Sequence, residues 1–188
     1  MLNAKQITFN KNKFLELSVE HNIFTPELLE FLGEELFVSP ATTSTDMYGC
    51  YPGGLVHHLF RVAKYSIELN ELLPETIRIN KSKLIKTVLL SQIGKVYLFK
   101  PNESEWHRNN LGKLYEYRDD EVIALSVGQR SIYYATTYGV KLDDDEFQAI
   151  INADSGEGRN QKWSSKPLSH VIKLGFEMAL LVEKNGSK

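Results

Sequence analysis

The stretch YPGGLVHHLFRVAKY, Tyr51 to Tyr65, contains the beginning of the clearest predicted helix in this chain. A Pro-Gly-Gly turn leads into a segment whose apolar residues recur at helical spacing, so we predict a helix from Leu55 to Leu73, just before Pro74. Two adjacent histidines stand at the beginning of this helix. Neutral imidazoles are common ligands of divalent metals, so a metal site here would need further ligands from elsewhere in the chain.

Helical periodicity dominates the rest of the sequence as well. Thr25 and Pro26 are favourable at a helix start, because threonine can cap the first turn and proline has no amide hydrogen to satisfy there. Further helices are predicted over residues 10–23, 25–36, 81–98, 119–126, 129–138, 143–153 and 168–183. We expect polar loops at 99–118 and 154–167, and a strand at most in the first few residues. The predicted class is all-α, a single bundle of about 7–9 helices.

Length, charge and cysteine content narrow the class of protein. The chain has 188 residues, enough for one domain, which we divide into an N-terminal helical extension over 1–35, packed on a core over 36–188. The net charge of −2 does not favour a nucleic-acid binder, because such proteins neutralise phosphates with a basic surface. No apolar run reaches the ~20 residues of a membrane span, and the lone cysteine, Cys50, fits a reducing compartment. We therefore expect a cytoplasmic protein with no membrane segment.

Two segments, in their order and spacing, resemble the HD-domain superfamily of metal-dependent phosphohydrolases. GGLVHHLFRVA is similar to the family's Gly-Gly-Leu-Leu-x-His segment, and LLSQIGKV to its Leu-Leu-His-Asp-Ile-Gly-Lys segment. LSVGQRSIYYATTYGVKLDDDEFQAIINADSG resembles the His-Gly-Glu-Arg-Ser segment and the acidic helix beyond it, and GFEMALLVE resembles the terminal Ala-Asp-Met segment. The resemblance covers residues 37–183, is closest to phage proteins and exoribonuclease-associated HD domains, and implies an HD-like helical bundle. A phage-encoded chain would work in the host cytoplasm.

The chain departs from the family at most of the metal-binding positions. The first family histidine falls on His58 and is retained, but the His-Asp pair that names the family falls on Ser91 and Gln92. The last family aspartate aligns with Glu177, and Asp154 lies next to another lost histidine position. The remaining metal candidates are therefore His58, Asp154 and Glu177. Other family positions that bear histidine or glutamate are occupied here by Tyr48, Val127, Gln129 and Ala153.

These departures weaken the case for hydrolysis. Ser91 and Gln92 offer neutral oxygens where the family has an imidazole and a carboxylate, so the charge that would hold a dication is reduced. Without a bound metal, nothing lowers the pKa of a water molecule enough to make it a nucleophile at neutral pH. We therefore assign no catalytic residue and expect no cofactor. If one is bound, it should be a divalent metal: Mn, Fe, Ni, Zn or Mg.

Several polar residues that are not metal ligands match the family pattern and could bind a ligand. Three or four cations around a cavity with few carboxylates would attract an anion such as a nucleotide phosphate. The alternative is that the same cations pair with surface acids. On the predicted helix over 81–98, Lys95 would share a face with Gln92. The candidate ligand-binding residues are His58, Arg61, Lys95, Lys113 and Arg130.

Three functions stay open at this point. The chain could be a pseudoenzyme that binds a nucleotide, another phosphate ligand or a protein partner. It could be a surviving phosphohydrolase or phosphodiesterase on nucleotides, with a rearranged metal site. It could also be a structural or host-interaction protein whose pocket is filled by side chains, as the residues at Tyr48, Val127 and Ala153 suggest.

Overall fold

The computed structural model describes residues 2–118, 125–153 and 166–185. Within these ranges the chain is mainly helical and has one small antiparallel sheet, so the predicted all-α class is confirmed. The helices are α1 (Ala4–Glu20), α2 (Pro26–Leu32), α3 (Glu35–Val38), α4 (Gly54–Glu71), α5 (Lys81–Leu90), α6 (Glu105–Leu111), α7 (Val127–Thr137), α8 (Asp144–Asn152) and α9 (Pro167–Asn185), with short 3-10 turns η1 (Glu75–Ile77) and η2 (Ile93–Lys95). None of these described helices is long and apolar enough to cross a membrane.

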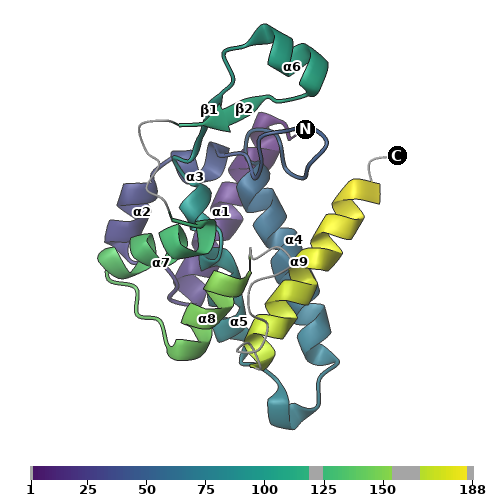
Figure 1. The fold of residues 1–188 in the computed structure, drawn as a ribbon. Coiled ribbons are helices and arrows are strands. Elements are labelled where there is room, and N and C mark those ends of the chain that lie inside the picture. The colour runs from purple at the N-terminus through teal and green to yellow at the C-terminus, as the bar shows by residue number, and fades with distance from the viewer. Residues whose placement is uncertain (1, 119–124, 154–165, 186–188) are drawn as a thin grey trace.

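The pair formed by α4 and α9 is the most extensive contact between described elements, and the two helices run side by side in Figure 1. A glycine makes this close approach possible. A Cβ atom at Gly175 of α9 would lie 2.1 Å from the hydroxyl oxygen of Ser66 on α4, so any larger residue would push the helices apart. The segment that follows the Pro-Gly-Gly turn is therefore the central helix of the fold, and α9 is its main partner.

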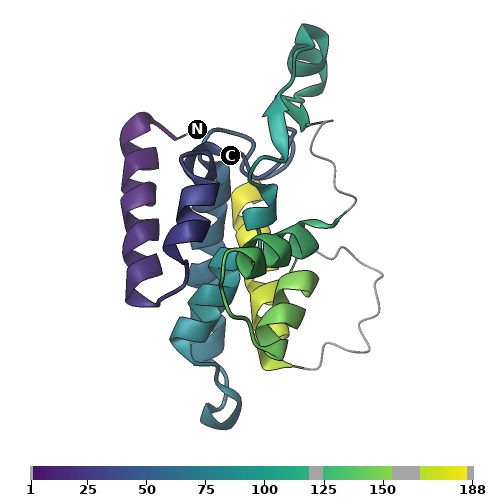
Figure 2. The same cartoon turned by 90° about the vertical axis from the view of Figure 1, so that its left-hand side faces the viewer.

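The N-terminal helices add a layer on the other side of α4. Figure 2 shows α1 at one edge of the molecule, where it contacts both α3 and α4. Phe14 of α1 is fully buried and contacts the rings of Phe24 and Phe37 at 5.1 and 5.8 Å between centroids. Buried side chains from α1 to α5 and from α7 to α9 belong to one apolar cluster. The division at residues 1–35 and 36–188 stays a prediction.

The helix predicted over 81–98 ends early, at Leu90. The Ser91 hydroxyl donates to the Val88 carbonyl at 2.8 Å, and the chain then turns into η2. Gly94 of η2 lies directly against α7: its amide donates to Ser131 Oγ at 2.9 Å, and a Cβ there would be 2.3 Å from the Val127 carbonyl oxygen. A straight helix could not make this contact, so the prediction of a continuous helix was wrong. The helix predicted over 25–36 is likewise split, at Gly33, which has φ of +52°.

The first residues and the expected loop at 99–118 also differ from the prediction. The chain start is helical, because Asn3 and Gln6 form a capping box at the beginning of α1. The expected loop forms a hairpin in which β1 (Phe99–Pro101) pairs antiparallel with β2 (Tyr115–Tyr117), with α6 between them. This hairpin projects from the helical body in Figures 1 and 2. The predicted helix over 119–126 and loop over 154–167 fall largely outside the described residues.

Candidate functional site

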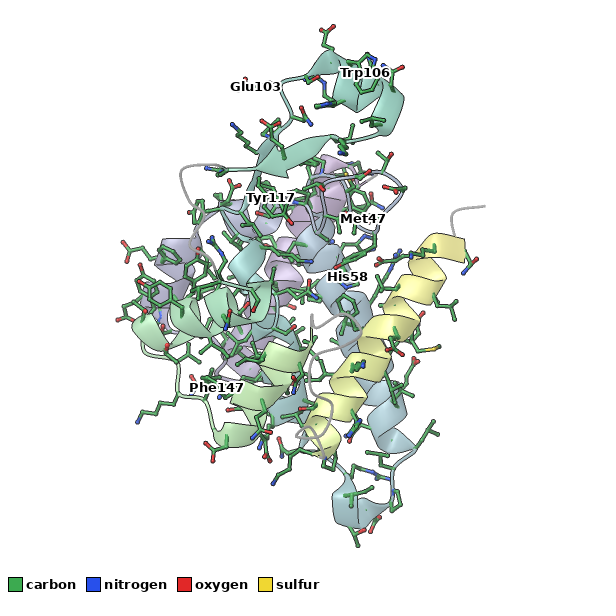
Figure 3. All side chains as sticks on the ribbon, in the orientation of Figure 1. Met47, His58, Glu103, Trp106, Tyr117 and Phe147 are labelled. Carbon is green, nitrogen blue, oxygen red and sulfur yellow. The ribbon has the colours of Figure 1, made fainter. Side chains whose placement is uncertain are left out.

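His58 is the centre of a buried polar cluster between α4 and α9. Figure 3 labels His58 at this place in the fold. Its side chain is fully buried, and its Nδ1 atom lies 3.1 and 3.2 Å from the two carboxylate oxygens of Glu183. Glu183, near the end of α9, also contacts Arg61 Nη1 at 3.0 Å. One carboxylate of α9 therefore holds two side chains that lie one helical turn apart on α4. We call His58, Arg61 and Glu183 the polar cluster.

The pKa shifts define how the protons are placed in the polar cluster. Burial lowers the pKa of His58, and the positive charges of Lys95 and Arg61 act in the same direction, against the effect of Glu183. Burial raises the pKa of Glu183, but its contacts with His58 and Arg61 outweigh burial and leave the pKa below its ordinary value. A neutral imidazole beside an ionised carboxylate carries its proton on Nδ1 and donates it to Glu183. His58 Nε2 is then an acceptor, and it has no hydrogen-bond partner among the described residues.

Tyr48 covers His58 on the side of the loop that precedes α4. The Tyr48 ring packs on the His58 ring at 4.3 Å between centroids, and Phe176 of α9 meets the His58 ring edge-on at 4.9 Å. Lys95 is buried and donates to the Tyr48 hydroxyl at 2.9 Å. The predicted ligand candidate Lys95 is thus placed beneath Tyr48, next to the polar cluster, and is not displayed on an open surface.

An open cleft of about 730 Å³ adjoins the polar cluster. Arg61 and Glu183 belong to both, so the cluster forms part of the cleft wall. Within the cleft, the Tyr51 hydroxyl lies 2.8 Å from His57 Nδ1. The cleft is lined by the start of α1, the loop before α4, α4 itself and the end of α9, through Leu2, Gln6, Thr45, Asp46, Met47, Tyr48, Gly49, Cys50, Tyr51, His57, Arg61, Glu183 and Lys184.

Of the predicted metal candidates, His58 and Glu177 lie in the described part of the chain and are not brought together. Ser91 uses its hydroxyl on the Val88 carbonyl, and Gln92 is buried with neither amide atom bonded to a described residue. Glu177 is exposed on α9, and the carboxylate that reaches His58 belongs to Glu183 instead. Asp154 lies outside the described residues. Over 2–118, 125–153 and 166–185, no three histidine, cysteine, aspartate or glutamate side chains could hold a metal ion together. The described side chains around His58 therefore do not fit the divalent metal that the family resemblance implies.

The predicted cations are dispersed as well. Arg130 is buried and holds η2 against α7: its Nε donates to the Gly94 carbonyl at 2.9 Å, and its Nη2 to the Tyr134 hydroxyl at 2.7 Å. Lys113 is exposed at the beginning of the chain segment that leads into β2, and it does not line the cleft. Of the five candidate ligand-binding residues, Arg61 lines the cleft. His58 does not line it, but contacts Glu183, the residue that holds Arg61.

Most of the cleft lining was not predicted from the sequence, including Tyr51, His57, Glu183 and Lys184. The sequence offers one signal for His57, because it lies four residues before Arg61 and must share a face of α4 with it. No signal in the sequence could have placed Lys184 beside them, since that contact depends on how α9 packs on α4.

Comparison of the chain with models of protein families, with curated proteins and with solved structures finds no match.

Proposed function

We propose that this chain is a non-catalytic protein with an HD-like helical fold, which binds a small phosphate-bearing ligand in the cleft at Arg61. The observation that carries the proposal is the position of Arg61. The buried carboxylate of Glu183 holds it, and about a third of the Arg61 side chain stays exposed in the cleft. Its five N–H donors are arranged as a rigid fork, so an Arg61 fixed by Glu183 can still donate to phosphate oxygens.

The size of the cleft supports a small-molecule ligand. Ligand sites in proteins are commonly cavities of about 300–1,000 Å³ with a few polar groups in a largely apolar lining, and the cleft of about 730 Å³ falls in that range. Its wall combines apolar side chains such as Leu2 and Met47 with the polar groups of α4 and α9. A nucleotide is the phosphate ligand that would use both kinds of surface.

The chemistry of the buried residues supports binding over hydrolysis. A metal-activated water needs a charged ligand set, and the described residues around His58 provide a neutral imidazole flanked by the positive charges of Lys95 and Arg61. Among the described residues, Glu183 is the carboxylate in contact with His58, and its two oxygens are already engaged by His58 and Arg61. A dication would have to compete with both of these contacts.

One observation favours a second candidate, a hydrolase with a rearranged site. His58 is oriented by a carboxylate through Nδ1 and has an unpartnered Nε2 acceptor, the arrangement of a general base. The Tyr48 ring packs against this histidine, so a substrate could reach it only if Tyr48 moved. Turnover of a nucleotide that is abolished in both His58→Gln and Glu183→Gln would favour this candidate.

Calorimetric titration with a panel of nucleotides in EDTA tests the binding proposal. We expect binding to the unmodified chain, and a loss of about tenfold or more in affinity for Arg61→Gln, because a phosphate loses its charge-assisted donors. Lys64→Gln is the matched control: Lys64 is on the same helix, 64% exposed, paired with Glu68 and outside the cleft. Circular dichroism of each variant establishes that it is folded. Absence of binding by any nucleotide, or equal losses in the two variants, would refute the proposal.

A further inference from the structure

We infer that the cleft selects a ligand with a single phosphate on a nucleoside-like body, and discriminates against nucleoside polyphosphates. This inference rests on the proposed function and specifies the ligand class of the same cleft. It follows from the charges on the cleft wall, from the hydrogen-bond donors of α4, and from the acidic and apolar side chains of the loop between α3 and α4.

The charges of the cleft wall are balanced. Arg61 and Lys184 supply two positive charges, and Asp46 and Glu183 supply two negative ones. Glu183 is paired with Arg61, whereas Lys184 has no ion-pair partner among the described residues. A phosphate monoester carries about −1.5 to −2 charges at pH 7. It can accept hydrogen bonds from the Arg61 guanidinium and pair with Lys184, the cation of the cleft wall that Glu183 does not neutralise. Each additional phosphate adds negative charge without adding a cation, and Asp46 in the same lining repels it.

The α4 side of the cleft offers donors. Burial raises the pKa of Tyr51, so its hydroxyl keeps its proton, and it lies 2.8 Å from His57 Nδ1. Burial lowers the pKa of His57, and Arg61 lowers it further, so the ring is neutral. In the tautomer in which Nδ1 accepts from Tyr51, His57 Nε2–H and the Arg61 guanidinium, one turn apart on α4, are both donors. Phosphate oxygens accept hydrogen bonds, so the phosphate belongs on this side.

The loop between α3 and α4 has the opposite character. Asp46 is exposed there and can only accept hydrogen bonds when ionised, and its neighbour Met47 is an exposed apolar side chain in the same lining. Figure 3 labels Met47 in this loop. A ligand body that satisfies both residues needs an apolar face and donor groups such as amino or hydroxyl hydrogens. A nucleoside has these features, and inorganic phosphate has neither.

The experiment is a calorimetric titration, in EDTA, of one nucleoside with its monophosphate, its triphosphate and inorganic phosphate. The inference predicts that the monophosphate binds at least about tenfold more tightly than each of the other three. Tighter binding of the triphosphate, or equal binding of inorganic phosphate, would overturn the inference while leaving a phosphate-binding function in place. Binding by none of them would instead refute the proposed function itself.

Two variants outside the buried cluster test the charge argument. Lys184→Ala removes an exposed cation, so monophosphate affinity should fall about three- to tenfold. Asp46→Asn removes a repulsive charge, so triphosphate affinity should rise relative to monophosphate by a similar factor. Lys173→Ala, on α9 but outside the cleft, is the control and should leave both affinities unchanged. An unchanged ratio of the two affinities in Asp46→Asn would overturn the inference.

Discussion

Replacing Glu183 by alanine should destabilise the fold far more than replacing Glu177 on the same helix. The Glu183 side chain is 5% exposed and accepts from His58 Nδ1 and from Arg61. Removing it leaves the buried His58 donor without a partner, which costs about 1–3 kcal/mol, while the partly exposed Arg61 is resolvated by water. With the lost packing included, we expect a loss of about 2–4 kcal/mol in the free energy of unfolding. Glu177 is exposed, so its replacement should change stability by less than about 0.5 kcal/mol.

Urea unfolding at pH 7.5, followed by circular dichroism, measures both changes under the same conditions. Glu183→Gln provides an intermediate case: it keeps the size of the side chain and one acceptor but loses the charge, so it should lie between the alanine variant and the unmodified chain. Equal effects of Glu183→Ala and Glu177→Ala would refute the assignment of Glu183 as the residue that holds His58.

Three further predictions concern the buried site and its packing. The pKa of His58 is lowered in the folded state, so the unfolded chain binds the proton first as pH falls below 6.5. Below that pH the free energy of unfolding should decrease by up to ~1.4 kcal/mol per pH unit. Urea unfolding at pH 5.5 and 7.5 should show a smaller difference between the two pH values for His58→Gln than for the unmodified chain. Gln92→Met removes a buried amide without described partners and should leave stability unchanged or raise it by up to about 2 kcal/mol in thermal unfolding; a marked loss would mean that the amide has a partner. Gly175→Ala should cost about 1–3 kcal/mol because the new methyl group meets Ser66, and adding Ser66→Ala should recover part of that loss in urea unfolding; no recovery would contradict the contact.

The helical class and the central helix could be predicted from the sequence because they depend on local information. The apolar periodicity of the segment after Gly53 and the missing amide hydrogen of Pro26 act within one or two turns. The same holds for α7 and α8, which begin within two residues of their predicted starts at 129 and 143. These elements needed no knowledge of what they pack against.

The early end of α5 could not be predicted, because its cause lies in another part of the chain. Residues 81–98 have helical periodicity throughout, yet Gly94 turns away to pack on α7 and is held by Ser131, 37 residues later. The hairpin at 99–118 has a similar explanation. Its strands are three residues each, too short to show alternation, and its polar sequence looked like a loop.

The candidate site was predicted in part. His58 and Arg61 are positioned by α4, so their common face could be inferred from their spacing. The alignment that favoured Glu177 was misleading, since only the packing of α9 on α4 determines which of its carboxylates faces His58, and the structure gives Glu183 this position. Lys95 and Arg130 match family positions in the sequence and were therefore predicted to bind phosphate. Their side chains are instead buried in contacts with Tyr48 and Tyr134.

Metal analysis of the chain, purified without chelators, distinguishes a metal-free polar cluster from a metal site. We expect transition metals well below one ion per chain, and a nucleotide that binds equally well with and without EDTA. A stoichiometric Mn, Fe, Ni or Zn ion that is lost in His58→Gln would contradict this expectation, because the polar cluster would then be a metal site.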